Sequence, residues 1–364
     1  MDLGVDIILK LPGLIDVHVH MREPGATHKE DWDSGTSAAL AGGVTMLLAM
    51  PNTDPPIVNA NTFYQTIAIA ENKTRCDFAQ FIGAGPKNAE AASKIAGNTA
   101  GLKMYLDMTY GDLRLVNMVF WHDHYNQWPV DSPLVVHSEG KTLAAAILFA
   151  DLYNRPVHIA HVSSREEIVT IRKAKEKGIK VTCEVTPHHL FFSVDDYSRI
   201  TKNGKYSGRI GVRPPITTSE DVRSLWENLD VIDCFATDHA PHLLSEKDSN
   251  SPPPGFPGLE TALPLLLNAV HEGRLTIKDL LLRFYTNPRR IFHLPEQPDT
   301  WIEVDPDEEY TINAANQFSK CGWTPFEGCR VRGRVNKVVL RGKTAYEDGR
   351  ILVNPGYGRN IRKL

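Results

Sequence analysis

Short apolar runs alternate with longer amphipathic stretches along this chain, and most of the short runs end at a polar residue. The first run, residues 14–19, is interrupted near its C-terminal end by His18, and His20 follows directly after it. Residues two apart on a strand point to the same side of the sheet. Two imidazoles side by side at a strand end can bind one metal ion. A pair of core or surface histidines fits an isolated His-x-His equally well, so the interpretation depends on the rest of the chain.

Seven further runs have the length and composition of buried strands. They cover residues 44–50, 78–82, 101–106, 134–136, 157–160, 179–185 and 231–236. Helix-like stretches separate them, and one of these begins with a capping-box pattern, Ser164 to Glu167, and ends at Gly178. Eight such units in order predict a (β/α)8 barrel of the TIM type over residues 13–304. An open, doubly wound sheet is the alternative, but it would not place all eight strand ends around one pocket.

The two ends of the chain follow a different pattern. Residues 335–341, 343–346 and 351–353 resemble antiparallel strands, with a turn at Asp348-Gly349. The apolar run from Val5 to Leu9, which precedes Pro12-Gly13, is too short for a domain of its own. We therefore expect residues 1–12 and 305–364 to form one small β domain. The proline-rich residues 251–258 predict a long loop beside the barrel.

Composition narrows the classes of function. The chain has 364 residues, a formal net charge of −4 and 23% charged residues, which argues against a general nucleic-acid or membrane-surface role. Its five cysteines include no C-x-x-C pair, so a reducing compartment fits better than a disulfide framework. The sequence shows no signal-peptide layout and no apolar run of transmembrane length. We expect a cytoplasmic protein.

Six polar residues at or near the predicted strand ends would share one face of the barrel. Such residues cost free energy when buried unless they are paired or bind something. Imidazoles and a carboxylate suit a metal such as zinc, whereas separately satisfied core polar residues are the alternative. A lysine ammonium would repel a metal, so it must be modified or point elsewhere. The six residues are His18, His20, Lys103, His137, His161 and Asp238.

In this order, these six residues resemble the ligand set of the amidohydrolase superfamily of binuclear metal hydrolases. The motifs at residues 14–25 and 238–242 are similar to those of dihydroorotases. Residues 50–53, 101–105, 252–261 and 287–292 closely resemble the dihydroorotase domain of eukaryotic CAD multifunctional proteins. The resemblance covers nearly the whole chain.

The resemblance implies a role for each candidate ligand. Lys103 matches a lysine that CO2 converts to a carbamate, which bridges two Zn2+ ions. His18 and His20 would bind one zinc together with Asp238, and His137 and His161 would bind the other. A hydroxide between the metals would be the nucleophile, and Asp238 would take its proton and return it to the leaving nitrogen.

The implied reaction is the reversible interconversion of N-carbamoyl-L-aspartate and dihydroorotate, the third step of de novo pyrimidine synthesis. Residues that match substrate contacts of the family are Arg22, Asn52, Arg213, His242 and Pro254. Thr109 and Tyr110 match a flexible loop that can close over the substrate, where the family usually has Phe in place of Tyr110. A hydantoinase- or allantoinase-like cyclic amidase and an inactive scaffold relative are the alternatives.

The sequence also departs from the family pattern. Some CAD domains bind a third zinc through a Cys that corresponds to Ala160, together with a glutamate that matches Glu184, so we expect two zinc ions rather than three. The segment 202–211 is longer than expected, which could change how Arg213 is presented. The resemblance further implies a homodimer and, as partners, carbamoyl-phosphate synthetase and aspartate transcarbamoylase modules of the same polypeptide.

Overall fold

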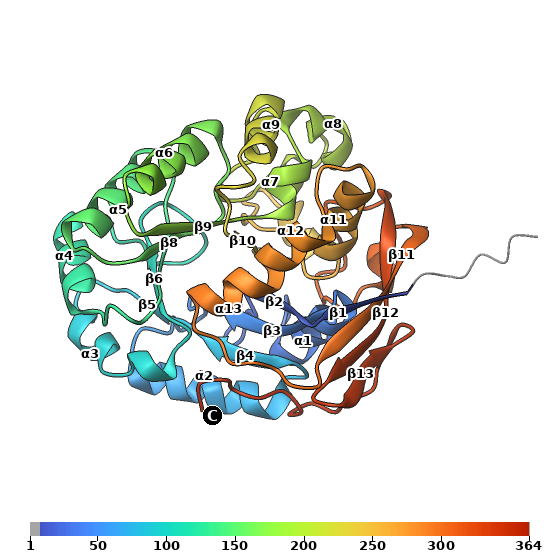
Figure 1. Ribbon diagram of the computed structural model, residues 1–364, viewed down its shortest axis with the longest axis horizontal. Helices are drawn as coiled ribbons and strands as arrows, with labels where there is room; N and C mark the ends of the chain where they lie inside the picture. Colours follow the sequence, from blue (N-terminus) through green and yellow to red (C-terminus); the bar gives the residue numbers. More distant parts are fainter. Residues whose placement is uncertain (1–7, 364) are drawn as a thin grey trace, which may run out of the picture.

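The computed structural model describes residues 8–363, so most of the apolar run at Val5 lies outside the described residues. Parallel strands surround the centre of the molecule, and helices lie outside them (Figure 1). The strand positions of the barrel, in chain order, are β2 (Leu14–Val19), β3 (Val44–Ala49), β4 (Asp77–Gln80) continued by β5 (Ile82–Gly83), β6 (Leu102–Tyr105), β7 (Leu134–His137), β8 (Val157–Ile159), β9 (Val181–Val185) and β10 (Cys234–Phe235). The prediction of a barrel of eight strand positions is confirmed.

Hydrogen bonds divide the barrel into two sheets, β2-β3-β4 and β10-β9-β8-β7-β6-β5. At one junction, the Phe81 N–H between β4 and β5 donates to the Ala49 carbonyl at 2.9 Å. At the other junction, the carboxylate of Asp16 on β2 accepts from the backbone N–H of Thr237 at 3.2 Å. Burial raises the pKa of Asp16 to about 7. This buried side chain therefore joins the first strand position to the last.

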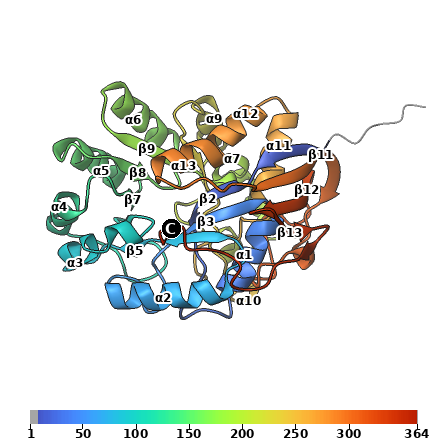
Figure 2. The same cartoon turned by 60° about the horizontal axis from the view of Figure 1, so that its bottom comes forward.

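The helices that cover the barrel follow the strands in alternation (Figures 1 and 2). In α6, Ser164 and Glu167 form the predicted capping box. The helices are α1 (Trp32–Ala41), α2 (Ala60–Lys73), α3 (Ala89–Ser93), α4 (Met118–Gln127), α5 (Lys141–Leu152), α6 (Arg165–Glu176), α7 (Pro187–Phe191), α8 (Tyr197–Ile200), α9 (Ser219–Glu227), α10 (Leu244–Lys247), α11 (Ala262–His271), α12 (Ile277–Leu281) and α13 (Asn287–Ile291). In residues 8–363, no helix combines the length and apolar character needed to cross a membrane.

A separate antiparallel sheet joins the two ends of the described chain beside the barrel. Its order is β1 (Leu9–Pro12), β11 (Trp301–Thr311), β12 (Arg330–Leu340), β13 (Lys343–Glu347) and β14 (Arg350–Ile351). Both turns of the β12–β13–β14 meander have positive φ at two successive residues, as a type I′ hairpin turn requires: Arg341-Gly342 and the predicted Asp348-Gly349. The sheet includes Trp301, so it extends slightly beyond the expected boundary at residue 305.

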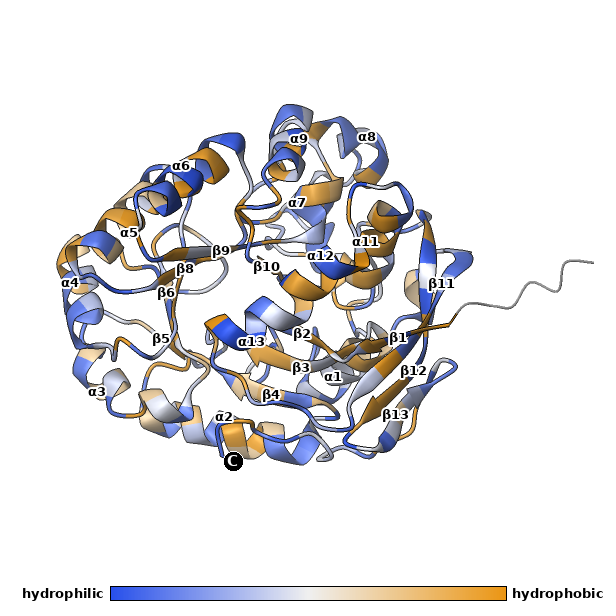
Figure 3. Cartoon of the chain, in the orientation of Figure 1, coloured by the Kyte–Doolittle hydropathy of each residue, from blue (hydrophilic) through white to orange (hydrophobic). Residues whose placement is uncertain are grey.

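Buried apolar residues of the strands and helices form the main core cluster. Figure 3 shows hydrophobic colour along the strands and both hydrophobic and hydrophilic colour on the surrounding helices. A second apolar cluster contains Ile15, Met46 and Val135, which lie near the beginnings of their strands, and also Phe292 and Leu294, which follow α13. The segment after α13 thus covers that end of the barrel. The opposite end, where the strands finish, is the end that carries the candidate site.

Candidate active site

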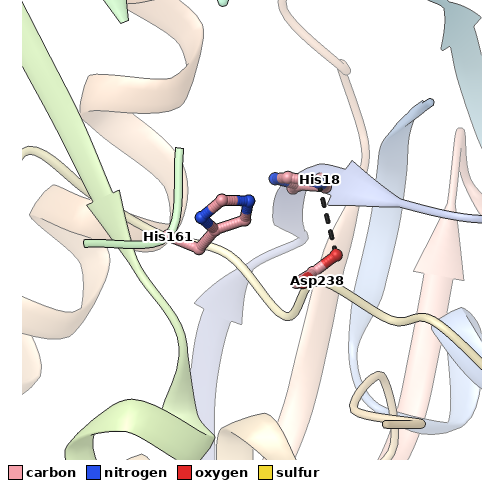
Figure 4. Close-up of side chains that lie close together, drawn as sticks. All are labelled: His18, His161 and Asp238. Carbon is pink, nitrogen blue, oxygen red and sulfur yellow. Dashed lines mark ion pairs between the residues drawn. The ribbon is translucent and has the colours of Figure 1, made fainter. Parts of the chain in front are cut away.

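The six candidate ligands converge at the C-terminal ends of the barrel strands. His18 lies on β2, Lys103 on β6 and His137 at the end of β7, while His161 and Asp238 lie in the turns after β8 and β10. All six side chains are buried. One donor atom from each of His18, His161 and Asp238 lies within 4.8 Å of the other two, and Figure 4 shows these three side chains turned toward one another.

The hydrogen bonds of the first two histidines indicate which ring nitrogen is available to a metal. The Nδ1 atom of His20 lies 2.7 Å from Oδ1 of Asn52, and Nδ1 of His18 lies against the carboxylate of Glu184. With a hydrogen on Nδ1, each ring has its lone pair on Nε2. Both Nε2 atoms face Oδ1 of Asp238, at 3.3 Å from His18 and 3.0 Å from His20. The two imidazoles and the carboxylate therefore point at one position.

The second group of donors contains Lys103, His137 and His161. Nδ1 of His137 lies 2.8 Å from Nε2 of His161. Among residues 8–363, no hydrogen-bond partner reaches Nζ of Lys103, Nε2 of His137 or Nδ1 of His161, although all three atoms are buried. Orphaned buried polar atoms are costly and rare in proteins. Their clustering fits a site whose ligands bind metal, which would satisfy them.

Burial and neighbouring charges keep these groups in the forms that bind metal. Burial lowers the pKa of Lys103 to about 8, so the neutral amine that can react with CO2 is accessible near neutral pH. Burial also lowers the pKa of His20 to about 4. For Asp238, burial acts to raise the pKa, but His18 and His20 outweigh it and hold the pKa well below its usual range. These shifts favour a neutral imidazole at His20 and an ionised carboxylate at Asp238.

Three residues of the site adopt left-handed backbone conformations that side chains other than glycine rarely take. The φ angles are +57° at Arg22, +37° at His161 and +45° at Asp238. Each such residue costs on the order of 1–3 kcal/mol, and strained residues of this kind cluster at functional sites. The turns just after strands β2, β8 and β10 thus aim these side chains into the cavity at a cost in stability.

The same cavity contains the residues predicted to hold a substrate. Arg22, Asn52, Arg213 and Pro254 line it together with the metal-binding candidates. Arg22 is buried: its Nε donates to the carbonyl of Pro241 at 3.1 Å, whereas Nη1 has no partner within the described part of the chain. Arg213 is exposed at the rim. A buried guanidinium with a free donor and a nearby exposed arginine suit an anionic group on the substrate.

The structure places His242 directly beside Arg22. It is completely buried and does not line the cavity. Its Nε2 lies 3.0 Å from Nη2 of Arg22 and 3.0 Å from the carbonyl of Pro254, so it lies behind these two residues. A direct contact between His242 and a substrate stays a prediction.

The loop after β6 covers the cavity. Thr109 and Tyr110 are lining residues, and the Tyr110 ring lies 4.9 Å from the guanidinium carbon of Arg22. The Tyr110 carbonyl accepts from Nδ2 of Asn52 at 3.0 Å. Asn52 therefore contacts the candidate ligand His20 on one side and the covering loop on the other.

The long segment before Arg213 is anchored to the proline-rich loop. The backbone N–H of Gly255 donates to the carbonyl of Gly211 at 3.0 Å. Nζ of Lys247 donates to the same carbonyl at 2.6 Å and to the carbonyl of Pro253 at 2.9 Å. Buried Lys247 thus connects the two loops that present Arg213 and Pro254.

Sequence reasoning missed Tyr105 and Lys29, and it named Glu184 only as the match to a third-zinc ligand. Tyr105 lines the cavity, and its buried hydroxyl has no partner among the residues described. It is two residues beyond Lys103 on the same strand, so strand periodicity could have identified it. Glu184 holds His18, and Lys29 contacts both His242 and Tyr110. Lys29 lies outside any strand-end pattern, and no local signal points to it.

A (β/α)8 barrel with these donors at its strand ends defines the class of metal-dependent amidohydrolases. A family model described as dihydro-orotase-like matches residues 7–98. The chain is 57% identical over 98% of its length to Multifunctional protein CAD of Squalus acanthias and 54% identical over 98% to Multifunctional protein pyr1-3 of Dictyostelium discoideum, and spans 16% of each. It is 37% identical to a dihydroorotase of Pyrococcus horikoshii, covering 97% of this chain and 84% of that protein. The chain belongs to the dihydroorotase family.

Solved structures give the same fold. An L-hydantoinase from Arthrobacter aurescens superposes with a TM-score of 0.90 at 24% identity, covering 98% of this chain and 89% of that one. An inactive dihydroorotase-like domain of a CAD-like multifunctional protein from Chaetomium thermophilum superposes with a TM-score of 0.83 at 28% identity, covering 98% and 99%. Because the fold occurs with different activities and without activity, the function must be argued from the site.

Proposed function

We propose that this chain is a dihydroorotase that uses two zinc ions bridged by carboxylated Lys103. It interconverts dihydroorotate and N-carbamoyl-L-aspartate in pyrimidine synthesis. The observation that carries the proposal is one cavity that combines two features. The metal-donor set includes three orphaned nitrogen atoms, and beside it lies the buried guanidinium of Arg22 with a free donor.

The donors divide into two groups that suit two metal ions. His18, His20 and Asp238 would hold one ion, and His137 and His161 the other, with the carbamate of Lys103 between them. Bound zinc supplies Lewis-acid chemistry, which polarises the ring carbonyl and lowers the pKa of water. Carboxylation would remove the positive charge of Lys103. It would also account for the buried Nζ atom, which has no hydrogen-bond partner among residues 8–363.

The protein's own residues orient the substrate and move the proton. Arg22, Asn52 and Arg213 would hold the substrate carboxylate, which places the ring amide toward Asp238. In ring opening, water oxygen adds to the ring carbonyl carbon and the carbon–nitrogen bond breaks. Oδ of Asp238 accepts the proton from water and passes it to the departing ring nitrogen. Tyr110 and Thr109 would exclude bulk water above the ring.

The alternative functions make different demands on the site. A hydantoin ring carries no carboxylate, so a hydantoinase would leave the buried Arg22 without an anionic partner. An inactive relative needs no complete ligand set, whereas this chain has all six donors together at the strand ends. Both observations favour dihydroorotase activity.

The test is to measure ring opening and ring closure by the purified protein together with its metal content. We expect turnover of dihydroorotate in both directions, with acidic pH favouring closure. Hydantoin and allantoin serve as control substrates. Faster turnover of either control would refute the proposed specificity, and no turnover by protein with both metals bound would support the scaffold alternative.

We also propose that the chain forms a homodimer in the cytoplasm and works beside carbamoyl-phosphate synthetase and aspartate transcarbamoylase modules. The 16% coverage of the CAD-type relatives supports a place within a longer polypeptide. Exposed apolar side chains on adjacent helices, Val119 on α4 and Leu148 and Leu152 on α5, support an interface. Light scattering of the protein and of a Leu148→Glu variant tests it: a monomeric parent protein would refute the dimer.

A further inference from the structure

Lys29 is a buried lysine outside the predicted site, in the loop between β2 and α1, and its side chain reaches the back of the substrate cavity. It is only 5% exposed. Its Nζ lies 3.0 Å from Oε1 of Glu246, 3.1 Å from Nδ1 of His242 and 3.4 Å from the hydroxyl of Tyr110. An ammonium has three hydrogens and no acceptor. Each of the three neighbours can therefore accept one hydrogen, which fixes the orientation of the group.

The contact with Lys29 decides which nitrogen of His242 carries hydrogen. A neutral imidazole has one N–H donor and one acceptor nitrogen. Because Lys29 can only donate, Nδ1 must be the acceptor, and the hydrogen must be on Nε2. That hydrogen has an acceptor at 3.0 Å, the carbonyl of Pro254.

This tautomer changes what the neighbouring Arg22 can do. Nη2 of Arg22 lies 3.0 Å from Nε2 of His242, but two N–H groups cannot bond to each other. With the opposite tautomer, Nε2 would accept one of the two Nη2 hydrogens. With the hydrogen on Nε2, His242 takes neither hydrogen of Nη2, and Nη1 already has no partner among the residues described.

We propose that Lys29 is a positioning residue for the substrate anion. By donating to Nδ1 of His242, it keeps all four hydrogens of the two terminal nitrogens of Arg22 available to a carboxylate. The proposal rests on the proposed dihydroorotase function, since it concerns the carboxylate of that substrate. Burial is the main cause that lowers the pKa of His242, and the charges of Arg22 and Lys29 lower it further. The imidazole therefore stays neutral, with a hydrogen on only one of its two nitrogens.

The first experiment uses the unmodified protein. Nitrogen-15 NMR of the histidine rings distinguishes the two tautomers, and loss of a signal in His242→Asn assigns it. We expect a hydrogen on Nε2 and none on Nδ1. A hydrogen on Nδ1 would overturn the proposal, whatever the activity of the protein, so this result is independent of the proposed function.

The second experiment replaces the lysine. In Lys29→Met, we expect the Nδ1–H tautomer to appear and KM for dihydroorotate to rise about 10- to 100-fold, the range for one buried charge-assisted hydrogen bond. The value of kcat and the zinc content should stay close to those of the parent protein, because Lys29 touches none of the candidate ligands. Lys29→Arg, which keeps a donor, should restore most of the affinity.

Lys320→Met is the control, because Lys320 also forms an ion pair, with Asp31, and its Nζ has no hydrogen bond to His242. It should leave KM and the tautomer unchanged. An unchanged tautomer or an unchanged KM in Lys29→Met would each refute the proposal. If the parent protein does not act on dihydroorotate, the proposed function fails, and the tautomer measurement alone then tests the role of Lys29.

Discussion

Glu184 gives the sharpest prediction about the metal site, because it orients ligands without being one of the six. Its side chain is completely buried. Its carboxylate accepts from the His18 ring, from the backbone N–H of His161 at 3.3 Å and from Nε2 of His158 at 3.1 Å. In Glu184→Gln, one oxygen becomes an NH2 group, which cannot accept. At least one histidine must then lose its partner or change tautomer.

The size of the effect follows from these contacts. A hydrogen bond to a charged group contributes about 1.5–3 kcal/mol. Losing the bond that fixes Nδ1 of His18 should weaken zinc binding by about 10- to 100-fold, which is the usual effect of removing the partner of a metal-binding histidine. Competition with a chelator of known zinc affinity measures this directly, and urea unfolding of the metal-free protein measures the separate effect on stability.

Glu167→Gln is the matched control. Glu167 is also buried and also accepts backbone hydrogen bonds, from Ser163 at 2.9 Å and Ser164 at 3.2 Å, but it touches no candidate ligand. It should lower stability and leave zinc affinity unchanged. If the zinc affinity of Glu184→Gln lies within twofold of that of the parent protein, Glu184 does not orient His18 for zinc binding.

Three further predictions concern the metals, the base and a buried lysine. Metal analysis should give about two zinc ions per chain, because Ala160 offers no donor and both oxygens of Glu184 already accept hydrogen bonds. A count near three zinc ions would contradict that expectation. A strong chelator should abolish ring opening. Asp238→Asn should abolish turnover while the circular dichroism spectrum stays unchanged, and a fully active variant would exclude Asp238 as the base. In the folded protein, burial and, to a lesser extent, the charge of Arg22 lower the pKa of Lys247 to about 7. In the unfolded chain, the lysine has its ordinary, higher pKa and keeps its proton up to a higher pH. The free energy of unfolding should therefore rise above pH 7, by up to about 1.4 kcal/mol per pH unit, until the ordinary lysine pKa is reached, and Lys247→Met should flatten this rise in urea titrations.

The barrel was predictable because each unit carries its own local signal. Apolar runs of strand length, separated by capped helices, appear in order, and the period of two places His18 and His20 on one side. The strand ends also predicted which six residues lie close together. The interruption at Phe81 was not predictable, because it depends on how two sheets meet around a closed barrel rather than on local propensity.

The contacts of the residues that support the candidate ligands and Arg22 also could not be predicted from the sequence alone. Lys29 and Glu184 act through hydrogen bonds to residues far away in the chain, and no spacing rule encodes such contacts. For His242, the motif indicated the right neighbourhood but not the burial behind Arg22. The contacts of Lys247 with two loops likewise depend on how those loops pack, so they became visible only in three dimensions.

The joining of the first strands to the last has a consequence for how the chain folds. Asp16 and Thr237 are separated by 221 residues, and β1 pairs with β11, which begins at Trp301. Contacts of such long range form slowly, because a large loop must close before they stabilise anything. During synthesis, β2 can pair early with β3, but β1 and the Asp16 carboxylate must remain without their final partners until most of the chain has emerged. The segment that carries the first two histidines is then both the earliest part of the site to be made and among the last to be enclosed.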